Sequence, residues 1–210
     1  MNLDTQGQAL TSYDTSSLMI DRLYDQAAGE NATVACFYFD FAARKEQSPT
    51  NMLGAVLKQV VRELREIPKE IKQAYEDQKR GVGGWRPRLT DIVRMLQAAA
   101  SENPTFICID GIDECLAEDQ ANIFDSLNRI LWRSPGTRVF MTGRPQIQPE
   151  VERHFSRRAI AVRIIPPRDD IVSYLQCRLG EDKTPDAMDS SLEGDILKRI
   201  PDDISEMWVE

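Results

Sequence analysis

One short apolar segment with an acidic end constrains the fold of this chain more than any other feature. Residues 105–109 read Thr-Phe-Ile-Cys-Ile, and the turn Asp-Gly-Ile-Asp-Glu of residues 110–114 follows directly. Apolar residues without alternation are typical of a strand that is buried on both faces of a parallel sheet. Asp110 would then end the strand at the edge where open α/β sheets bind their ligands. The segment therefore predicts an α/β protein with a ligand site at the carboxyl end of this strand.

The three carboxylates of the turn indicate what chemistry such a site would support. A Mg²⁺ ion carried by a nucleotide is usually held by one or two carboxylates together with water and phosphate oxygens, which suits Asp110. Asp113 or Glu114 could orient an attacking water. The alternative is a strand that simply ends in an acidic turn.

Strands and helices alternate along the rest of the chain. Segments rich in β-branched, aromatic and apolar residues predict further strands at 33–41, 137–142 and 159–164. Apolar residues at helical spacing predict helices at 16–28, 49–67, 69–79, 90–100, 120–132, 148–155, 169–179 and 192–200. Ser48 should cap the second of these helices, with Pro49 as its first residue. Strands that alternate with helices in this way predict a parallel sheet built from βαβ units.

The composition of the chain limits the classes of partner that it is expected to bind. The 210 residues suit one domain, or one domain with a tail. A net charge of -8 argues against a general binder of nucleic acid or of anionic membranes. No segment approaches the roughly 20 apolar residues of a membrane span, and the first residues lack the basic and apolar regions of a signal peptide. We therefore expect a cytoplasmic protein.

The cysteines and the single histidine carry no motif of their own. Cys36, Cys108, Cys115 and Cys177 show no C-x-x-C spacing, so we interpret them as reduced thiols rather than as metal ligands. His154 is expected to be solvated or to cap a helix end.

Three segments together resemble a known family. Residues 105–115 resemble the Walker B segment of the NACHT family of P-loop NTPases, in which an apolar run leads into Asp-Gly-apolar-Asp-Glu. More closely, they resemble the nephrocystin-3-like N-terminal domain of fungal signalling proteins. Residues 36–41, Cys-Phe-Tyr-Phe-Asp-Phe, are similar to the aromatic second strand of that domain. Residues 139–145 are similar to its sensor-1 strand, which ends in an arginine, here Arg144, before a proline.

The resemblance implies a fold, a set of roles and a function. The fold would be an incomplete, P-loop NTPase-like three-layer sandwich with a mainly parallel sheet. The family uses Mg²⁺ and ATP, so Asp110 would bind the metal, Asp113 and Glu114 would be catalytic, and Arg144 would reach toward the γ-phosphate. Residues 15–180 would form the truncated NACHT-like domain, after an irregular or disordered lead at 1–14 and before a helical extension at 181–210.

The phosphate-binding loop of that family is missing from the sequence. G-x-x-x-x-G-K-[ST] cradles phosphates with backbone N–H groups and neutralises them with its lysine. No Gly-Lys pair occurs anywhere in the chain. The glycines of residues 81–84 follow no predicted strand, so we interpret that stretch as a linker. In the resembling fold the loop strand is expected between strands 105–110 and 137–142, so its loss predicts a gap, a rearranged sheet or a marginal fold.

The functional prediction follows from this loss. We expect a fragment of a nucleotide switch that does not hydrolyse ATP and that docks with intact relatives or with itself, without nucleic-acid or membrane partners. Two alternatives stay open. One is an active ATPase with an atypical phosphate site, and the other is a metal-dependent hydrolase that uses Asp110, Asp113 and Glu114 directly.

Overall fold

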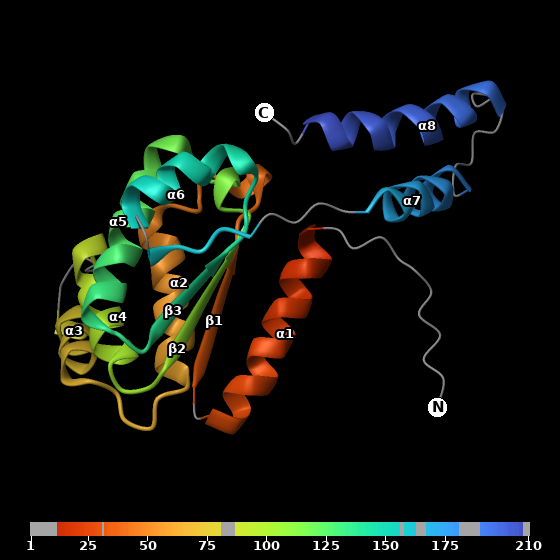
Figure 1. Ribbon diagram of the computed structural model, residues 1–210. Helices are drawn as coiled ribbons and strands as arrows, with labels where there is room; N and C mark the ends of the chain where they lie inside the picture. The colour runs from red at the N-terminus through yellow and green to blue at the C-terminus, as the bar shows by residue number, and fades with distance from the viewer. Residues whose placement is uncertain are drawn as a thin grey trace. The chain divides into compact units, whose positions relative to one another are not determined.

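Three parallel strands form a continuous sheet in the order β1-β2-β3 (Figure 1). They are β1 (Thr33–Tyr38), β2 (Thr105–Asp110) and β3 (Thr137–Met141). The central strand is the apolar segment that the sequence singled out, and it pairs with both neighbours along its length. The α/β class and the parallel sheet are confirmed.

The computed structural model describes residues 12–30, 32–80, 87–155, 158–162, 167–180 and 190–207. The chain divides into two compact units, Ser16–Ala161 and a second made of Met1–Thr15 with Val162–Glu210. The helices of the first unit are α1 (Ser12–Glu30, which begins just before it), α2 (Pro49–Arg62), α3 (Lys69–Arg80), α4 (Leu89–Ala100), α5 (Ala117–Arg133) and α6 (Gln148–Phe155). The second unit contains α7 (Arg168–Gly180) and α8 (Ser190–Met207), which pack on each other and are linked by an Arg168–Asp202 ion pair.

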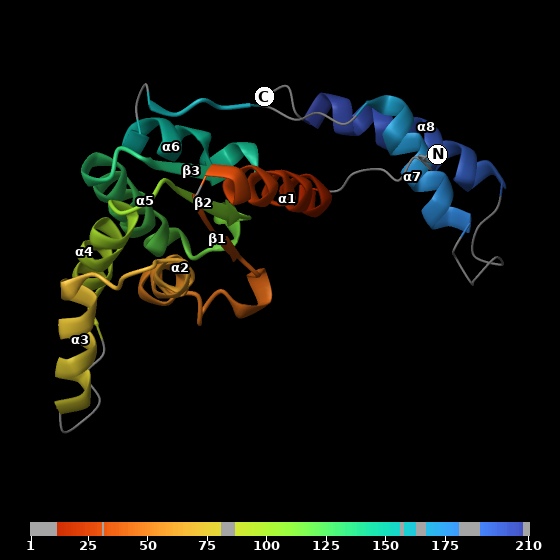
Figure 2. The same ribbon diagram turned by 90° about the horizontal axis from the view of Figure 1, so that it is seen from below.

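Helices cover both faces of the sheet in the first unit, as Figures 1 and 2 show. On one face α1 packs its buried residues Ile20 and Ala27 against Val34 and Cys108. On the other face α2, α4 and α5 close a larger core over the alternate strand residues, which include Ile107 and Ile109. Since side chains alternate across a strand, the unbroken apolar run of β2 supplies both cores at once.

The sequence signals at the start of α2 are confirmed. Ser48 is the N-cap, its hydroxyl accepts a hydrogen bond from the Asn51 amide at 3.3 Å, and Pro49 is the first helical residue. On α2, Gln59 also protects the outer edge of β1. Its side chain accepts from the Cys36 amide at 3.0 Å and donates to the Cys36 carbonyl at 2.8 Å.

The expected gap in the sheet is wrong. After α5 the chain returns directly beside β2, and both ends of the β2–β3 pair are closed by backbone hydrogen bonds. The Thr105 amide donates to the Gly136 carbonyl at 3.3 Å, and the Thr142 amide donates to the Ile109 carbonyl at 2.9 Å. No room for a strand is left between β2 and β3, because each strand residue of β2 from Thr105 to Ile109 has a partner in β3.

Several predicted boundaries also differ from the structure. The strand predicted at 33–41 ends at Tyr38, because the Asp40 carboxylate accepts from the Ala42 amide and turns the chain into a 3-10 helix, η1 (Phe41–Ala43). Of the strand predicted at 159–164, residues 159–162 have no regular structure and Ile160 is 92% exposed, whereas 163 and 164 lie outside the described residues. A β-prone sequence makes no strand there because the described residues bring no partner strand to it.

Helix ends differ as well. Helix α1 begins at Ser12, within the lead predicted to be irregular, while residues 1–11 lie outside the described part of the chain. Helix α5 begins three residues earlier than expected, and Glu118 and Asp119 in its first turn favour that start through the helix dipole. Helix α8 runs through Pro201 to Met207.

Candidate functional site

The acidic turn after β2 is shaped by Gly111. This residue has a φ of 66°, a left-handed conformation that glycine adopts without strain. The turn leads into a 3-10 helix, η2 (Ile112–Glu114), and buries the Ile112 side chain completely. The Ile112 amide donates to the Thr142 carbonyl at 3.1 Å, so the turn is tied to the residue that follows β3.

Asp110 is buried at the end of β2, with 5% of its surface exposed. Its Oδ1 accepts a hydrogen bond from the hydroxyl of Thr142. The same hydroxyl accepts from the Gly111 amide at 3.1 Å. Thr142 therefore joins the ends of β2 and β3, a role that was missed from the sequence. The available signal was its place directly after β3, because parallel strands end at the same edge of a sheet.

Asp113 and Arg144 form the second link between the two strand ends. Asp113 Oδ1 accepts from the Arg144 amide at 3.1 Å, and Asp113 Oδ2 lies 3.4 Å from Arg144 Nε. The Asp113 side chain is 6% exposed and that of Arg144 is 68% exposed. Arg144 is thus anchored at its backbone by a buried carboxylate while most of its guanidinium faces solvent.

Gly143 makes this close approach possible. A Cβ at this position would lie 2.7 Å from Ile147 Cδ1, 3.0 Å from Ile112 Cγ2 and 3.2 Å from Asp113 Oδ1. Such distances are shorter than ordinary van der Waals contact, so a side chain would push the segment after β3 away from the acidic turn.

Glu114 reaches in the opposite direction, toward the end of β1. Its Oε2 accepts from the Phe41 amide at 3.0 Å, at the start of η1. The Phe39 amide donates to the Asp110 carbonyl at 2.9 Å and continues the β1–β2 pairing. Glu114 thus holds the segment after β1 against the segment after β2.

The structure brings all four predicted site residues to one edge of the sheet. Asp110, Asp113 and Glu114 lie on the turn after β2, and Arg144 lies beside them after β3. Their proposed roles remain predictions, because the contacts seen are with the protein itself. Within the described ranges, no group of three or more histidine, cysteine, aspartate or glutamate residues is arranged to hold a metal ion.

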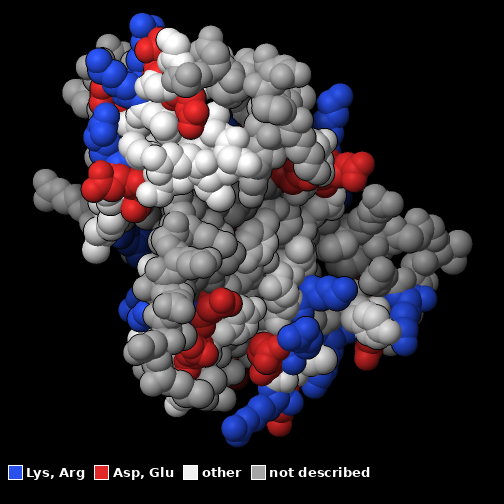
Figure 3. Space-filling model, turned by 90° about the vertical axis from the view of Figure 1, so that its right-hand side faces the viewer, with Lys and Arg blue, Asp and Glu red and all other residues white. Residues whose placement is uncertain are grey.

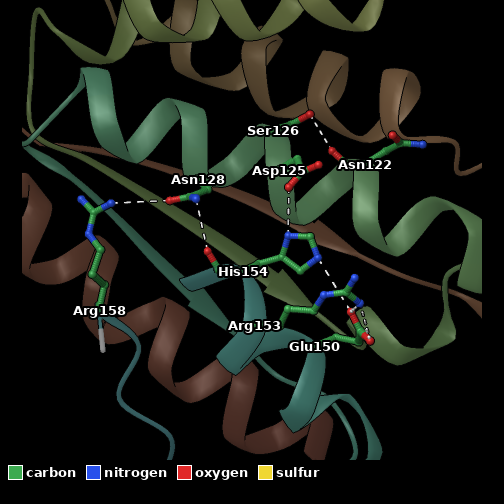
Figure 4. A network of polar contacts seen from close by, with 8 residues as sticks. All are labelled: Asn122, Asp125, Ser126, Asn128, Glu150, Arg153, His154 and Arg158. Atoms are coloured by element: carbon green, nitrogen blue, oxygen red, sulfur yellow. Dashed lines mark hydrogen bonds and ion pairs between the residues drawn. The ribbon is translucent and has the colours of Figure 1, made fainter. Parts of the chain in front are cut away.

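A second polar cluster surrounds His154 where α6 packs on α5 (Figure 4). His154 Nδ1 lies 2.9 Å from Asp125 Oδ1, and its Nε2 lies 3.8 Å from Glu150 Oε2. The nearby Ser126 hydroxyl instead donates to the Asn122 carbonyl at 2.6 Å and points away from the imidazole. The cluster therefore lacks a nucleophile.

The same cluster corrects the expectation for His154. Its side chain is only 13% exposed, and its ring packs against Phe124 with centroids 5.5 Å apart. Asn128 also donates to the His154 carbonyl at 3.2 Å. His154 is therefore not solvated, and its contacts hold α6 against α5.

Comparison with known proteins supports the family resemblance that the three sequence segments indicated. A family model described as "Nephrocystin 3, N-terminal" matches residues 15–144, which is more than half of the chain. The chain belongs to the nephrocystin 3 N-terminal family. The matched range includes β1, β2 with its acidic turn, and β3 through Arg144, so the resemblance to a NACHT-like domain is confirmed. No curated protein and no solved structure matches the chain.

The residues of this site only partly fit the Mg²⁺ and ATP that the family implies. A buried aspartate at a strand end suits a metal ligand, but its Oδ1 already accepts from Thr142. The printed sequence contains no Gly-Lys pair, which the family's phosphate-binding loop normally includes.

Proposed function

We propose that this nephrocystin-3-like chain is a NACHT-like interaction module that does not hydrolyse ATP by itself. The observation that carries the proposal is the use of the acidic turn as a structural junction. Asp110 and Asp113 accept hydrogen bonds from Thr142 and Arg144 in the segment after β3, and Glu114 accepts one from Phe41 in the segment after β1. Carboxylates that are bonded in this way stabilise the ends of the strands rather than orient an attacking water.

Electrostatics support the same conclusion. Three carboxylates and one guanidinium meet at this edge, and the guanidinium already pairs with Asp113. A triphosphate would enter a field that is negative on balance, without the lysine that normally neutralises it. We infer that ATP binds weakly or not at all at this edge.

Protein partners fit the surface better than nucleic acid or a membrane. On the face shown in Figure 3, basic and acidic side chains of the described residues are interspersed. The net charge of -8 would repel a phosphate backbone or an anionic lipid surface. No helix in the described part of the chain has the length and apolar character needed to cross a membrane. The proposed setting is cytoplasmic signalling, with intact relatives or a second copy as partner.

The test is a thermal melt with and without millimolar Mg-ATP, combined with a phosphate-release assay. The matched control is Asp110→Asn, which keeps an oxygen to accept from Thr142 but removes the charge that would bind Mg²⁺. We expect no turnover and the same melting temperature with and without nucleotide in both proteins.

A different outcome would favour an active ATPase with an atypical phosphate site. A ligand at 100 times its Kd stabilises a protein by about 2.7 kcal/mol, so binding would be visible as a raised melting temperature. A shift or turnover in the natural protein that Asp110→Asn lacks would refute the proposal. Metal-dependent hydrolysis without nucleotide has less support, since the described residues contain no metal-binding cluster.

A further inference from the structure

Two cysteines from distant parts of the sequence lie side by side beneath α1. Cys36 of β1 and Cys108 of β2 are direct partners in the parallel pairing, so their side chains share one face of the sheet. That face is covered by α1 through Ile20 and Ala27. Neighbouring strands lie about 4.8 Å apart, which is within the range of roughly 4.4–6.8 Å between the Cα atoms of disulfide-bonded cysteines.

The backbone of Cys36 is held firmly in place. Gln59 of α2 accepts from its amide at 3.0 Å and donates to its carbonyl at 2.8 Å. On the other side Cys36 is fixed by the pairing of β1 with β2. The strand register therefore places the two cysteines at a backbone separation that a disulfide can span.

The surroundings distinguish the two thiols. Cys108 is buried, with 1% of its surface exposed, whereas Cys36 is partly accessible. The neighbouring Cys108 thiol and, to a smaller extent, the Tyr24 hydroxyl of α1 interact with the Cys36 sulfur as hydrogen-bonding groups. These groups lower the pKa of Cys36 against the opposing effect of burial. The Tyr24 hydroxyl also lies 3.5 Å from the Val34 carbonyl.

The other cysteines lack these features. Cys115 is buried, its thiol donates to the Leu116 carbonyl at 3.6 Å, and burial raises its pKa to about 11. Cys177 is exposed on α7 in the second unit. Cys36 is thus a partly accessible thiol with a lowered pKa and a second thiol beside it on the paired strand, which is the environment of a redox-sensing cysteine.

We propose that Cys36 and Cys108 form a redox-active pair, in which a hydroperoxide oxidises Cys36 and Cys108 resolves the product into a disulfide. Neither cysteine is part of the acidic turn at residues 110–114. Disulfides in reducing compartments are usually transient and redox-sensing, which suits a pair partly sheltered by a helix.

The reaction balances with hydrogen peroxide as the only co-reactant. The Cys36 thiolate attacks one peroxide oxygen, the O–O bond breaks, and hydroxide leaves and takes up the proton that Cys36 released. Cys36 is then a sulfenic acid, oxidised by two electrons. The Cys108 sulfur attacks the Cys36 sulfur, the S–O bond breaks, and the departing hydroxide leaves as water with the Cys108 proton. Two thiols and one peroxide give one disulfide and two waters.

The test treats the reduced, folded full-length chain with hydrogen peroxide, blocks remaining thiols with N-ethylmaleimide, and maps the peptides by mass spectrometry. We expect a linkage between the peptides of Cys36 and Cys108, with Cys36 oxidised at least about tenfold faster than Cys177. In Cys108→Ser the sulfenic acid on Cys36 should persist and be trapped by dimedone. Cys36→Ser should form no disulfide, and Cys177→Ser should behave as the natural protein.

Tyr24→Phe tests the positioning role of the hydroxyl. The rate of Cys36 alkylation by iodoacetamide should fall about three- to tenfold near neutral pH, and its pH profile should move to higher pH. A linkage through Cys177, or oxidation of Cys36 no faster than of Cys177, would overturn the proposal. Mapping of the natural protein decides the matter even where a serine variant folds poorly.

Discussion

Gly143→Ala tests whether the acidic turn depends on the close approach of the segment after β3. The new methyl group would lie 2.7 Å from Ile147 Cδ1, which is the end of a flexible side chain and can rotate away. It would also lie 3.0 Å from Ile112 Cγ2 and 3.2 Å from Asp113 Oδ1. Ile112 is fully buried, and Asp113 holds both the amide and the guanidinium of Arg144. These two neighbours cannot yield without loss of packing or of hydrogen bonds.

Overpacking of this kind destabilises by roughly 1–3 kcal/mol. Since Ile147 can move, we expect a loss of about 1–2 kcal/mol, which lowers the melting temperature by roughly 3–6 °C in a unit of this size. The Arg144 amide should also exchange its hydrogen faster, because its acceptor is displaced.

Gly29→Ala is the matched control. Gly29 lies in α1, and nothing would approach its Cβ within 4 Å. Because Gly29 lies in the last turn of α1, alanine should leave the stability unchanged or raise it by up to about 0.5 kcal/mol through its helix propensity. Urea unfolding of both variants decides the question, and a Gly143→Ala protein as stable as the natural one would refute this account of the turn.

Three further predictions concern single side chains. Thr142→Val should lower the free energy of unfolding by about 1–3 kcal/mol in urea titrations, because Asp110 and the Gly111 amide lose a hydrogen-bond partner. Thr137→Val should be neutral or stabilising, since among the described residues no group forms a hydrogen bond with the buried Thr137 hydroxyl. Glu114→Ala should cost about 1 kcal/mol and Glu114→Gln clearly less, since glutamine still accepts from the Phe41 amide; equal losses would contradict that contact. Burial raises the pKa of Cys115 from 9.0 to about 11, so the folded state keeps a proton that the unfolded state releases, and stability should fall as pH rises from about 9 to 11. Cys115→Ala should flatten that part of the stability profile, and an unchanged slope would contradict it.

Local sequence signals predicted the individual helices and strands better than they predicted which strands lie side by side. The unbroken apolar run of β2 and the Ser48-Pro49 start of α2 follow from burial and capping within a few residues, and both are confirmed. The position of β3 directly beside β2 depends on contacts between segments that are about 30 residues apart, which no local pattern encodes. For the same reason the β-prone residues 159–162 were predicted as a strand but have no partner among the described residues.

The candidate site divides in the same way. The carboxylates were predicted because the chemistry of a residue type and its place at a strand end can be seen in the sequence, and Arg144 was predicted because residues 139–145 resemble the family's sensor-1 strand. Their partners were not: the bond from Thr142 to Asp110 and the approach of Cys36 to Cys108 exist only once the strand register is set. Register is a tertiary property, since each row of a sheet joins residues that are remote in sequence.

The acidic turn therefore contributes to the stability of the fold, whether or not it also binds a nucleotide. Each of its carboxylates joins β2 to the end of another strand: Asp110 and Asp113 to the segment after β3, and Glu114 to the segment after β1. Asp110→Ala would consequently weaken the fold without any nucleotide present, and its lower melting temperature alone would say nothing about ATP. Only a difference between variants that changes when Mg-ATP is added separates a nucleotide site from a junction. Asp110→Asn, which keeps an acceptor for Thr142, is the substitution in which the two roles give different results.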